Sequence, residues 1–495
     1  MNAKKLLGRI FPRTKIPDRE IRSVTENTRL ADAGSIFVCI RGARVDGHAL
    51  APDAYQNGCR LFVAEHPLEI PADAHVLLTE NTRLTLAHLA CELYGHPSKR
   101  LHVIGITGTK GKTTTAQLTA SLLNDCGIPC GYVGTNGIAY GDVRRATQNT
   151  TPDAITLQKT FVEMIDNGMH AVCVEVSSQA LMQHRVDGTR FSTVLFTNLS
   201  SDHVGPNEHP SFEHYRACKH RLFTDFGAKC AIWNTDDAAY ARMQEGCTAR
   251  RQITVSALTT GVDLTAKSIF PINTDTAHGI AFTLCQKKHE YPAHLPLIGR
   301  CNVSNALQAL AVATEIMKIP PRQAIDALSH ARVDGRSEWI ALPGGGAAVI
   351  DYAHNGESLR QILTALREYA PRRLTVLFGS VGERTQLRRR ELGTVAASLA
   401  DFCVLTSDNP GHEPPEAIID EIAEAFVGTE TEYLKIPDRE EAILTALKMT
   451  EANDILLLAG KGHETYQLIG SEKRYFCEKD IVNEYVKSKT ETVTV

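Results

Sequence analysis

The sequence lacks the features that mark several classes of protein. It contains no run of about 18 consecutive apolar residues, the length that a membrane-spanning helix needs, so we expect no membrane insertion. The opening stretch MNAKKLLGRIFPRTK has neither a long apolar core nor a small-residue cleavage site, which predicts that it is not a signal peptide. Internal repeats and low-complexity tracts are also missing.

The sequence has neither a closely spaced cysteine pair nor an excess of positive charge. The 13 cysteines never form a C-x-x-C pair, and an odd, scattered set in a long chain predicts reduced thiols in a cytoplasmic protein. The 53 lysines and arginines are outnumbered by 57 aspartates and glutamates, so the net charge is −4. This balance argues against nucleic acid as a partner.

The pattern that is present is an alternation of strands and helices. Apolar runs alternate with helical patterns in two series, which predicts α/β domains with mostly parallel sheets. Buried strands are expected at residues 101–106, 171–176, 193–197, 230–233, 347–352, 374–379, 402–406 and 455–460. Helices are expected at residues 112–123 and 415–427, the second with apolar positions 418, 419, 422 and 426 on one face.

The length of 495 residues suggests about three domains. We predict boundaries that give domains at residues 1–98, 99–335 and 336–495. Shorter strands such as SIFVCI and CRLFVA lie in the first domain.

A glycine-rich loop follows the expected strand at 101–106. Its residues are Thr107, Gly108, Thr109, Lys110, Gly111, Lys112, Thr113 and Thr114. Glycines let backbone N–H groups close around phosphate oxygens, and the start of the following helix adds a positive dipole end. In such a loop Lys112 reaches the β- and γ-phosphates and the Thr113 hydroxyl holds Mg²⁺. The general motif has glycine where this chain has Ile106, so the loop is a variant.

Further segments follow in a fixed order along the chain. They are residues 175–178, 197–203, 215–219, 299–305, 334–338, 351–354, 407–410 and 459–464. Together with the loop at 107–114, which reads T-G-T-x-G-K-T-T, these segments resemble those of the Mur ligases in order and spacing. The Mur ligases are a family of ATP-dependent enzymes that add amino acids. N-T-T-P-D at 149–153, D-N-P and A-G-K-G-H-E resemble the tripeptide-forming subgroup of that family.

The resemblance implies a fold and a reaction. The expected fold is an N-terminal α/β domain that binds the uridine nucleotide, a central P-loop ATPase domain and a C-terminal Rossmann-like domain that binds the amino acid. The expected reaction adds meso-diaminopimelate or L-lysine to the D-glutamate of UDP-N-acetylmuramoyl-L-Ala-D-Glu through an acyl-phosphate. The enzyme is expected to be a monomer that serves peptidoglycan precursor synthesis.

The same resemblance assigns residues to catalysis and metal binding. Lys112 and Arg336 would supply positive charge to the transferred phosphoryl group. Thr113, Glu175, His203 and Lys219 would hold two Mg²⁺ ions, with Lys219 carbamoylated by CO₂ to N6-carboxylysine so that it offers oxygen donors. Asn305 and Asp351, together with the loop and Arg336, would contact ATP.

The two other substrates have their own expected residues. The UDP-muramoyl-dipeptide site would comprise Thr28, Arg29, His48, Asn149, Thr150, Thr151, Ser177, Gln183 and Arg185. The incoming amino acid would meet Arg389, Asp408, Asn409, Gly460 and Glu464. Gly411 stands where diaminopimelate enzymes usually have arginine, so the sequence leaves the identity of the diamino acid open.

Two other functions share many of these residues. One is a different ligase of this fold, such as a folylpolyglutamate synthetase. The other is a binding protein of the same fold without activity. The uridine-type N-terminal segment argues against the first. The set of Lys112, Glu175, His203, Lys219 and Arg336 argues against the second.

Overall fold

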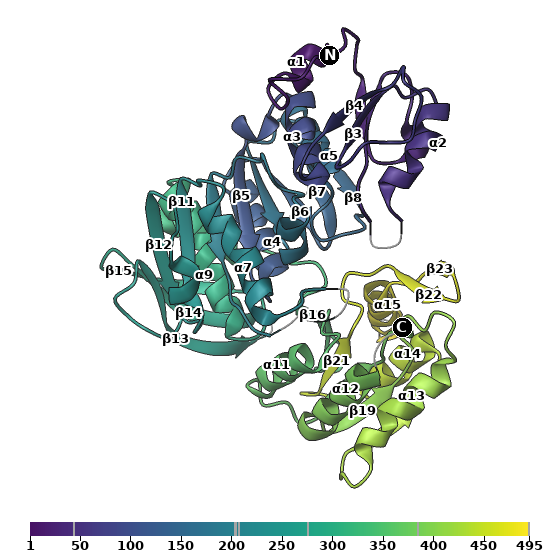
Figure 1. Cartoon of the computed structure of the whole chain (residues 1–495). Coiled ribbons are helices and arrows are strands. Elements are labelled where there is room, and N and C mark those ends of the chain that lie inside the picture. The colour runs from purple at the N-terminus through teal and green to yellow at the C-terminus, as the bar shows by residue number, and fades with distance from the viewer. Residues whose placement is uncertain (43–44, 202–204, 206–207, 275–276, 384–385, 494–495) are drawn as a thin grey trace. The chain divides into compact units, whose positions relative to one another are not determined.

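The computed structural model describes residues 1–42, 45–201, 205, 208–274, 277–383 and 386–493, which form two compact units (Figure 1). Unit 1 comprises Met1–Leu264 and Gln308–Pro320, and unit 2 comprises Thr265–Leu307 and Pro321–Val495. No helix in these described ranges is long and apolar enough to cross a membrane. All 13 cysteines lie within them as free thiols.

Unit 1 begins with a four-stranded parallel sheet in the order β1-β2-β3-β4. All four residues of both β2 and β3 are buried, and the apolar side chains on the two faces of the sheet belong to two separate core clusters. The elements of this part are α1 (Ala3–Leu7), β1 (Ser23–Thr25), η1 (Thr28–Leu30), β2 (Ser35–Val38), η2 (Gly47–Leu50), α2 (Ala51–Gln56), β3 (Leu61–Ala64), β4 (His75–Leu78), α3 (Thr82–Leu93) and η3 (Pro97–Lys99).

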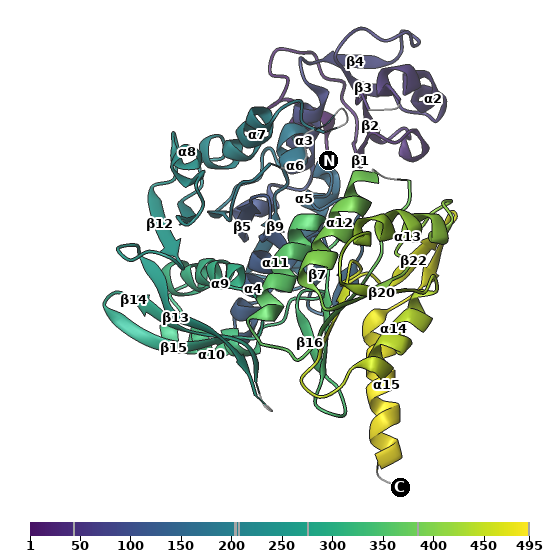
Figure 2. The same cartoon turned by 90° about the horizontal axis from the view of Figure 1, so that it is seen from below.

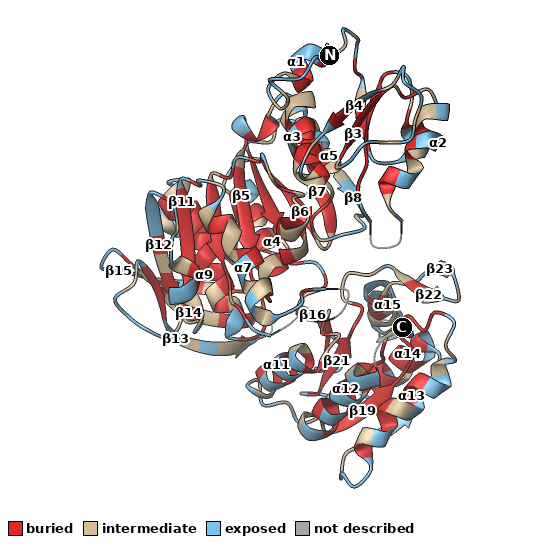
Figure 3. Ribbon diagram, viewed as in Figure 1, coloured by how far each residue is buried: buried red, intermediate tan, exposed pale blue. Residues whose placement is uncertain are grey.

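The larger sheet of unit 1 carries the phosphate loop. Its strands follow the order β12-β11-β10-β5-β9-β6-β7-β8, parallel from β12 to β6 and antiparallel beyond. The strands are β5 (His102–Thr107), β6 (Cys130–Gly134), β7 (Gly137–Tyr140), β8 (Val143–Arg145), β9 (Ala171–Glu175), β10 (Thr193–Phe196), β11 (Cys230–Asn234) and β12 (Arg251–Ser256). The helices are α4 (Lys112–Asp125), α5 (Ala154–Asp166), α6 (Ser178–Met182), α7 (Phe212–Thr224), α8 (Tyr240–Gln244) and the π-helix η4 (Val312–Ile316). Figure 3 shows the central strands as buried ribbons.

Unit 2 contains a six-stranded sheet in the order β16-β17-β21-β18-β19-β20, antiparallel only at β16. Its strands are β16 (Glu338–Ala341), β17 (Ala347–Asp351), β18 (Leu374–Phe378), β19 (Phe402–Leu405), β20 (Glu432–Lys435) and β21 (Ile455–Ala459). Unit 2 also contains β14 (His278–Gln286), β15 (His289–Leu295), α10 (Pro321–His330) and the hairpin β22 (Tyr466–Ile469) and β23 (Glu472–Tyr475). It contains all of β13 (Leu264–Asn273) except Leu264, and the part of α9 (Cys301–Ala311) up to Leu307.

Helices cover both faces of the six-stranded sheet because successive strand residues point to opposite sides. Val349 and Leu457 join the core under α11 (Gly356–Arg367), α12 (Gln386–Leu399) and α13 (Pro415–Ala423). Ile350 and Leu458 join the core under α14 (Arg439–Met449) and α15 (Glu478–Val493). Helices α11, α12 and α13 pack side by side in chain order (Figure 2).

The eight strands predicted in the two later domains are confirmed with their ends within one residue. SIFVCI and CRLFVA are confirmed as β2 and β3, but β2 ends and β3 begins two residues inside the predicted range. The helix expected at 112–123 is α4, which continues to Asp125. The helix expected at 415–427 ends at Ala423, followed by the 3-10 turn η5 (Glu424–Phe426). Its four apolar positions are buried as predicted, but Val427 is 84% exposed and lies outside the helix.

Candidate active site

The phosphate loop and two neighbouring segments meet at one edge of the larger sheet of unit 1. Strands β9 and β10 pair with β5 on either side, so Glu175 lies across from Ile106 and Phe196 from Thr107. Because all three strands are parallel, their carboxyl ends lie together, where open α/β sheets bind ligands.

Glycine is required at the first turn of the loop. Gly108 has φ +154°, and a Cβ added there would lie 1.9 Å from Thr197 Oγ1. Gly111, with φ +81°, precedes the first residue of α4. The side chains of Thr107, Thr109, Thr113 and Thr114 are all buried. The backbone can therefore approach a ligand closely at the helix start.

The segment after β10 braces the loop. Asn198 Oδ1 accepts from the N–H of Lys110 at 2.8 Å, and Asn198 Nδ2 donates to the carbonyl of Lys110 at 3.0 Å. Thr197 Oγ1 donates to the same carbonyl at 2.7 Å. The T-N-L-S-S segment is conspicuous in the sequence, but only the structure shows that Thr197 and Asn198 fix the shape of the loop.

Two lysines converge on the carbonyl of Gly108. Lys112 Nζ donates to this oxygen at 2.8 Å and to the carbonyl of Thr109 at 2.9 Å. Lys219 Nζ, from α7, donates to the Gly108 carbonyl at 2.8 Å and lies 4.6 Å from the centre of the Tyr215 ring. Lys219 is only 1% exposed. The structure therefore brings Lys219 to the loop.

Glu175 is a fully buried carboxylate surrounded by donors. It accepts from Thr113 Oγ1 at 2.9 Å, from the Tyr132 hydroxyl at 2.5 Å and from the Thr135 N–H at 2.9 Å. Burial, and next the charge of Glu175, raise the pKa of Tyr132, so the phenol keeps its proton and donates. A Cβ at Gly134 would lie 2.1 Å from Glu175 Oε1. Tyr132, Gly134 and Thr135 carry no motif that could have revealed this role.

The Thr113 hydroxyl and the Glu175 carboxylate fit a magnesium ion, because Mg²⁺ prefers oxygen ligands. His203, the expected ligand of a second ion, lies outside the described residues.

Five of the residues expected to hold the muramoyl-dipeptide lie in one cluster beside Glu175. They are Thr150, Thr151, Ser177, Gln183 and Arg185. Hydrogen bonds of 2.7 to 3.3 Å join Thr151 to Ser177 and to the carbonyl of Glu175, and join Arg185 to Gln183 and to the carbonyl of Thr151. The Thr150 hydroxyl lies 3.2 Å from that of Thr135. Burial, and next the Arg83 guanidinium, lower the pKa of Arg185. Two clustered arginines near a partly buried site suit an anionic ligand.

The other expected substrate residues are placed differently. Thr28 and Arg29 form the short turn η1, with Arg29 exposed. Asn149 is exposed in a loop. His48 is buried, its Nε2 accepts from the N–H of Glu65 at 3.0 Å, and its Nδ1 therefore carries the proton toward Asp46 at 2.7 Å. Both ring nitrogens of His48 are committed to the protein, which makes it a support for this turn.

In unit 2, Arg336 lies among Tyr352, Asp351 and His463. Its guanidinium carbon is 5.0 Å from the centre of the Tyr352 ring. Burial raises the pKa of Asp351, against the opposing effect of Arg336, and Asp351 accepts from the Ser337 N–H at 2.8 Å. Burial, followed by the positive charges of Arg336 and His354, lowers the pKa of His463 to about 4.

Asn305, the expected adenine ligand, is buried and donates to Asn302 Oδ1 at 2.9 Å.

The residues expected to bind the amino acid surround a buried lysine. Lys461 Nζ contacts Asp408 Oδ1 at 3.3 Å, Asn409 Oδ1 at 3.0 Å and Glu464 Oε2 at 3.2 Å. Asn409 Nδ2 also donates to Glu464 at 3.0 Å. A Cβ at Gly460 would lie 3.1 Å from Asp408 Oδ2. The sequence motif A-G-K-G-H-E contains Lys461, but its position at the centre of this cluster appears only in the fold.

Arg389 belongs to a different group of charges in unit 2. Its guanidinium donates to Glu413 at 2.6 Å and to Glu421 at 2.9 Å, and the residue is 1% exposed. These carboxylates raise the pKa of Arg389 against the effect of burial. A substrate carboxylate that binds Arg389 would therefore compete with two internal partners.

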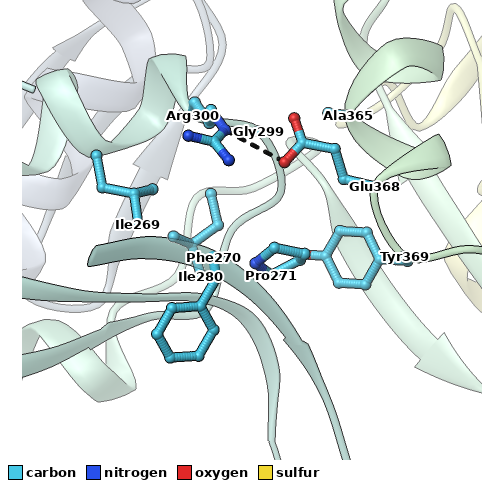
Figure 4. A pocket seen from close by; sticks show the side chains of 9 residues that line it. All are labelled: Ile269, Phe270, Pro271, Ile280, Gly299, Arg300, Ala365, Glu368 and Tyr369. Carbon is cyan, nitrogen blue, oxygen red and sulfur yellow. Dashed lines mark hydrogen bonds and ion pairs between the residues drawn. The ribbon is translucent and has the colours of Figure 1, made fainter. Parts of the chain in front are cut away.

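A small hollow in unit 2 is separate from all of these groups (Figure 4). Apolar side chains of β13 and β14 and Tyr369 line it, and the Arg300–Glu368 ion pair of 3.3 Å lies at its edge. It contains none of the residues expected to act in catalysis.

Family profiles match this chain in three consecutive regions. The Mur ligase family catalytic domain matches residues 20–94, the Mur ligase middle domain residues 106–313, and the Mur ligase glutamate ligase domain residues 335–462. A protein of Bacillus cereus, named UDP-N-acetylmuramoyl-L-alanyl-D-glutamate–2,6-diaminopimelate ligase, is 35% identical over 487 residues, which is 97% of this chain and 96% of that protein. The chain belongs to the Mur ligase family.

Other Mur ligases agree with this assignment. A ligase of the same name from Caldanaerobacter subterraneus is 37% identical over 470 residues, 94% of this chain and 95% of that protein. A solved structure of a ligase with this name matches with a TM-score of 0.72 and 27% identity over 98% of this chain and 99% of its own. The Mur ligase architecture of three domains, with mostly parallel sheets, confirms the predicted fold class.

Proposed function

We propose that this chain joins a diamino acid to the D-glutamate of UDP-N-acetylmuramoyl-L-Ala-D-Glu at the expense of ATP. The observation that carries the proposal is the similarity over nearly the whole chain to ligases named for this reaction. The cluster of phosphate loop, Glu175 and Lys219 supports it, because it gathers the charges that phosphoryl transfer requires.

The first step moves the γ-phosphoryl group of ATP to the D-glutamate carboxylate. Lys112, released from the loop carbonyls, stabilises the negative charge of the transferred group, and loop N–H groups bind the phosphates. Thr113 and Glu175 would hold Mg²⁺, and the bound ion would neutralise phosphate charge. Arg185 and the threonines beside it orient the anionic substrate.

The second step forms the amide bond. The free amine of the diamino acid attacks the carbonyl carbon of the acyl-phosphate, and phosphate leaves. Asp408, Asn409 and Glu464 orient the ammonium end of the amino acid, and Lys461 holds these three side chains in place.

Lys219 acts as N6-carboxylysine in this proposal. The Lys219 ammonium first loses one proton, and the resulting amine adds to CO₂ with loss of a second proton. The two steps replace a buried cation with an anion. The carbamate nitrogen keeps one N–H, so it can still donate to the carbonyl of Gly108. The carbamate oxygens, with His203, would hold a second Mg²⁺ ion.

The relatives are named for 2,6-diaminopimelate, which favours meso-diaminopimelate as the amino acid. Two features count against it: Gly411 replaces the usual arginine, and Arg389 is already paired with Glu413 and Glu421. The identity of the amino acid is therefore what the experiment tests. The purified chain is incubated with ATP, Mg²⁺ and the UDP-muramoyl-dipeptide, and with meso-diaminopimelate, L-lysine or L-ornithine in turn. Phosphate release and the mass of the product are measured. We expect tripeptide and phosphate only when all substrates are present, with meso-diaminopimelate preferred. Turnover with a folate substrate instead, or no turnover at all, would refute the proposal.

A further inference from the structure

Unit 1 contains a second group of metal-type side chains next to the phosphate loop. The donor atoms of His209, His214 and Cys218 all lie within 4.8 Å of one another. His214 and Cys218 are four residues apart on α7, so they share one helical face, and His209 comes from the segment before α7. His209 is fully buried, Cys218 is 6% exposed and His214 is half-buried.

The distances suit a tetrahedral ion. The two Nδ1 atoms of His209 and His214 are 2.9 Å apart, and Cys218 Sγ is 3.8 Å from His214 Nδ1. With zinc–nitrogen bonds of about 2.05 Å and zinc–sulfur bonds of about 2.3 Å, tetrahedral geometry places two nitrogens about 3.3 Å apart and nitrogen and sulfur about 3.6 Å apart. Movements of a few tenths of an ångström would bring His214 to these distances from both His209 and Cys218. The third pair, His209 and Cys218, lies within 4.8 Å, so its donors would have to approach each other as the ion binds.

A neighbouring hydroxyl can orient one of the ligands. Ser178 Oγ, at the start of α6, lies 2.9 Å from His209 Nε2. A His209 tautomer that donates from Nε2 to this oxygen leaves the lone pair of Nδ1 directed at His214 and Cys218. Metal-binding histidines commonly have their second nitrogen held in this way.

We propose that His209, His214 and Cys218 bind a zinc-class transition-metal ion, with water in the fourth position. The Cys218 thiol exchanges its proton for a sulfur–metal bond, one proton leaves to solvent, and no oxidation state changes. Imidazole and thiolate ligands favour Zn²⁺ over Mg²⁺, so this site differs in kind from the oxygen ligands at Thr113 and Glu175.

The position of the site suggests what the ion would do. The His209 ring packs edge-on against Tyr215 at 5.3 Å, and the Tyr215 hydroxyl donates to Thr109 Oγ1 at 3.1 Å. A bound ion would tie residue 209 to the first turns of α7, and thereby hold Tyr215 against the phosphate loop.

Cobalt binding tests the site without any measurement of ligase turnover. The full chain is stripped of metal and titrated with Co²⁺ in excess Mg²⁺ without nucleotide. We expect one equivalent to bind with tetrahedral ligand-field bands and a thiolate-to-cobalt charge-transfer band, and Zn²⁺ to displace it. Cys218→Ser should abolish the charge-transfer band, and His214→Ala should weaken binding. Cys247→Ser, at a partly exposed thiol of unit 1 outside the cluster, should change neither.

Ser178→Ala tests whether the Ser178 hydroxyl orients His209 or binds the metal ion itself. It should weaken cobalt affinity about 10- to 100-fold while the charge-transfer band remains. Circular dichroism of each metal-free variant checks that its fold is intact, and Ser178→Ala and His214→Ala keep the test open if Cys218→Ser does not fold. The proposal is overturned if the stripped protein binds no Co²⁺, if the band survives Cys218→Ser, or if Mg²⁺ competes as well as Zn²⁺.

Discussion

The side chain of Lys112 lies where it can exchange loop carbonyls for phosphate oxygens. Lys112→Ala removes this charge from the transferred phosphoryl group, and the loss of one such stabilising group costs about 10²–10³ in kcat. Tripeptide formation at saturating substrate measures the effect. The exposed Lys229 provides the matched control, since Lys229→Ala should leave turnover unchanged. Full turnover by Lys112→Ala would contradict the assignment of the loop.

Gly134 tests the environment of Glu175. A methyl group at this position would meet Glu175 Oε1 at 2.1 Å and the Tyr132 hydroxyl at 2.3 Å. Gly134→Ala should therefore destabilise unit 1 by about 1–3 kcal/mol, the usual cost of overpacking, and should raise the Mg²⁺ concentration needed for half-maximal turnover. Thermal unfolding and a magnesium titration measure the two effects. An unchanged magnesium requirement would show that Glu175 does not hold the ion.

His463 makes a prediction about pH. Its folded pKa of about 4 lies below the ordinary 6.5, so between these values the unfolded chain binds a proton that the folded chain does not. Stability should therefore fall as the pH drops from about 6.5 toward 4. His463→Gln should reduce this fall, measured as the urea midpoint at pH 7 and pH 5. His289→Gln, at an exposed histidine, should leave it unchanged.

At the scale of secondary-structure elements, the apolar runs predict eight strands within one residue because each of these buried strands is a short run. The runs at 35–40 and 59–64 each exceed their strand by two residues. The end of α13 was predicted too far along the chain: Phe426 keeps the helical spacing, but the backbone tightens to a 3-10 turn before it. Tyr132 and Thr135 as partners of Glu175, and Lys461 at the centre of its cluster, could not be predicted. They come from segments that only tertiary folding brings together, as do Ser178, His209 and Cys218.

One buried ion pair joins α15 to α14, in addition to the apolar side chains of α15 in the core. Arg439 of α14 donates to Glu478 of α15 at 2.9 Å and to the carbonyls of Ser407 and Ala459, and both charged side chains are fully buried. Glu478→Ala leaves a buried charge without its partner and should cost about 3–5 kcal/mol. The double variant Arg439→Met/Glu478→Leu should cost less.

Urea unfolding and hydrogen exchange of α15 measure both changes. The exposed Lys435–Asp420 pair is the control, and Asp420→Ala should cost only about 0–1 kcal/mol. If Glu478→Ala lowered the free energy of unfolding no more than Asp420→Ala, the Arg439–Glu478 pair would not stabilise the packing of α15.

At the scale of the whole molecule, the residues proposed for one reaction are divided between the two units. Lys112, Glu175 and Lys219 belong to unit 1, whereas Arg336 and Asp408 belong to unit 2. Phosphoryl transfer and amine attack act on the same carboxylate, so both sets must meet it during turnover. Ligand-driven closure is a common means to assemble such a site.

We therefore predict that ATP analogue, Mg²⁺ and the UDP-muramoyl-dipeptide together reduce the radius of gyration measured by small-angle X-ray scattering. The sequence assigns Arg336 to the transferred phosphoryl group, so we expect the loss of this guanidinium to weaken closure over the bound phosphates. Arg336→Ala should still bind the nucleotide but show less compaction, whereas Lys229→Ala should compact like the unmodified chain. Scattering curves that are identical with and without ligands would show that the two units do not close over the substrates.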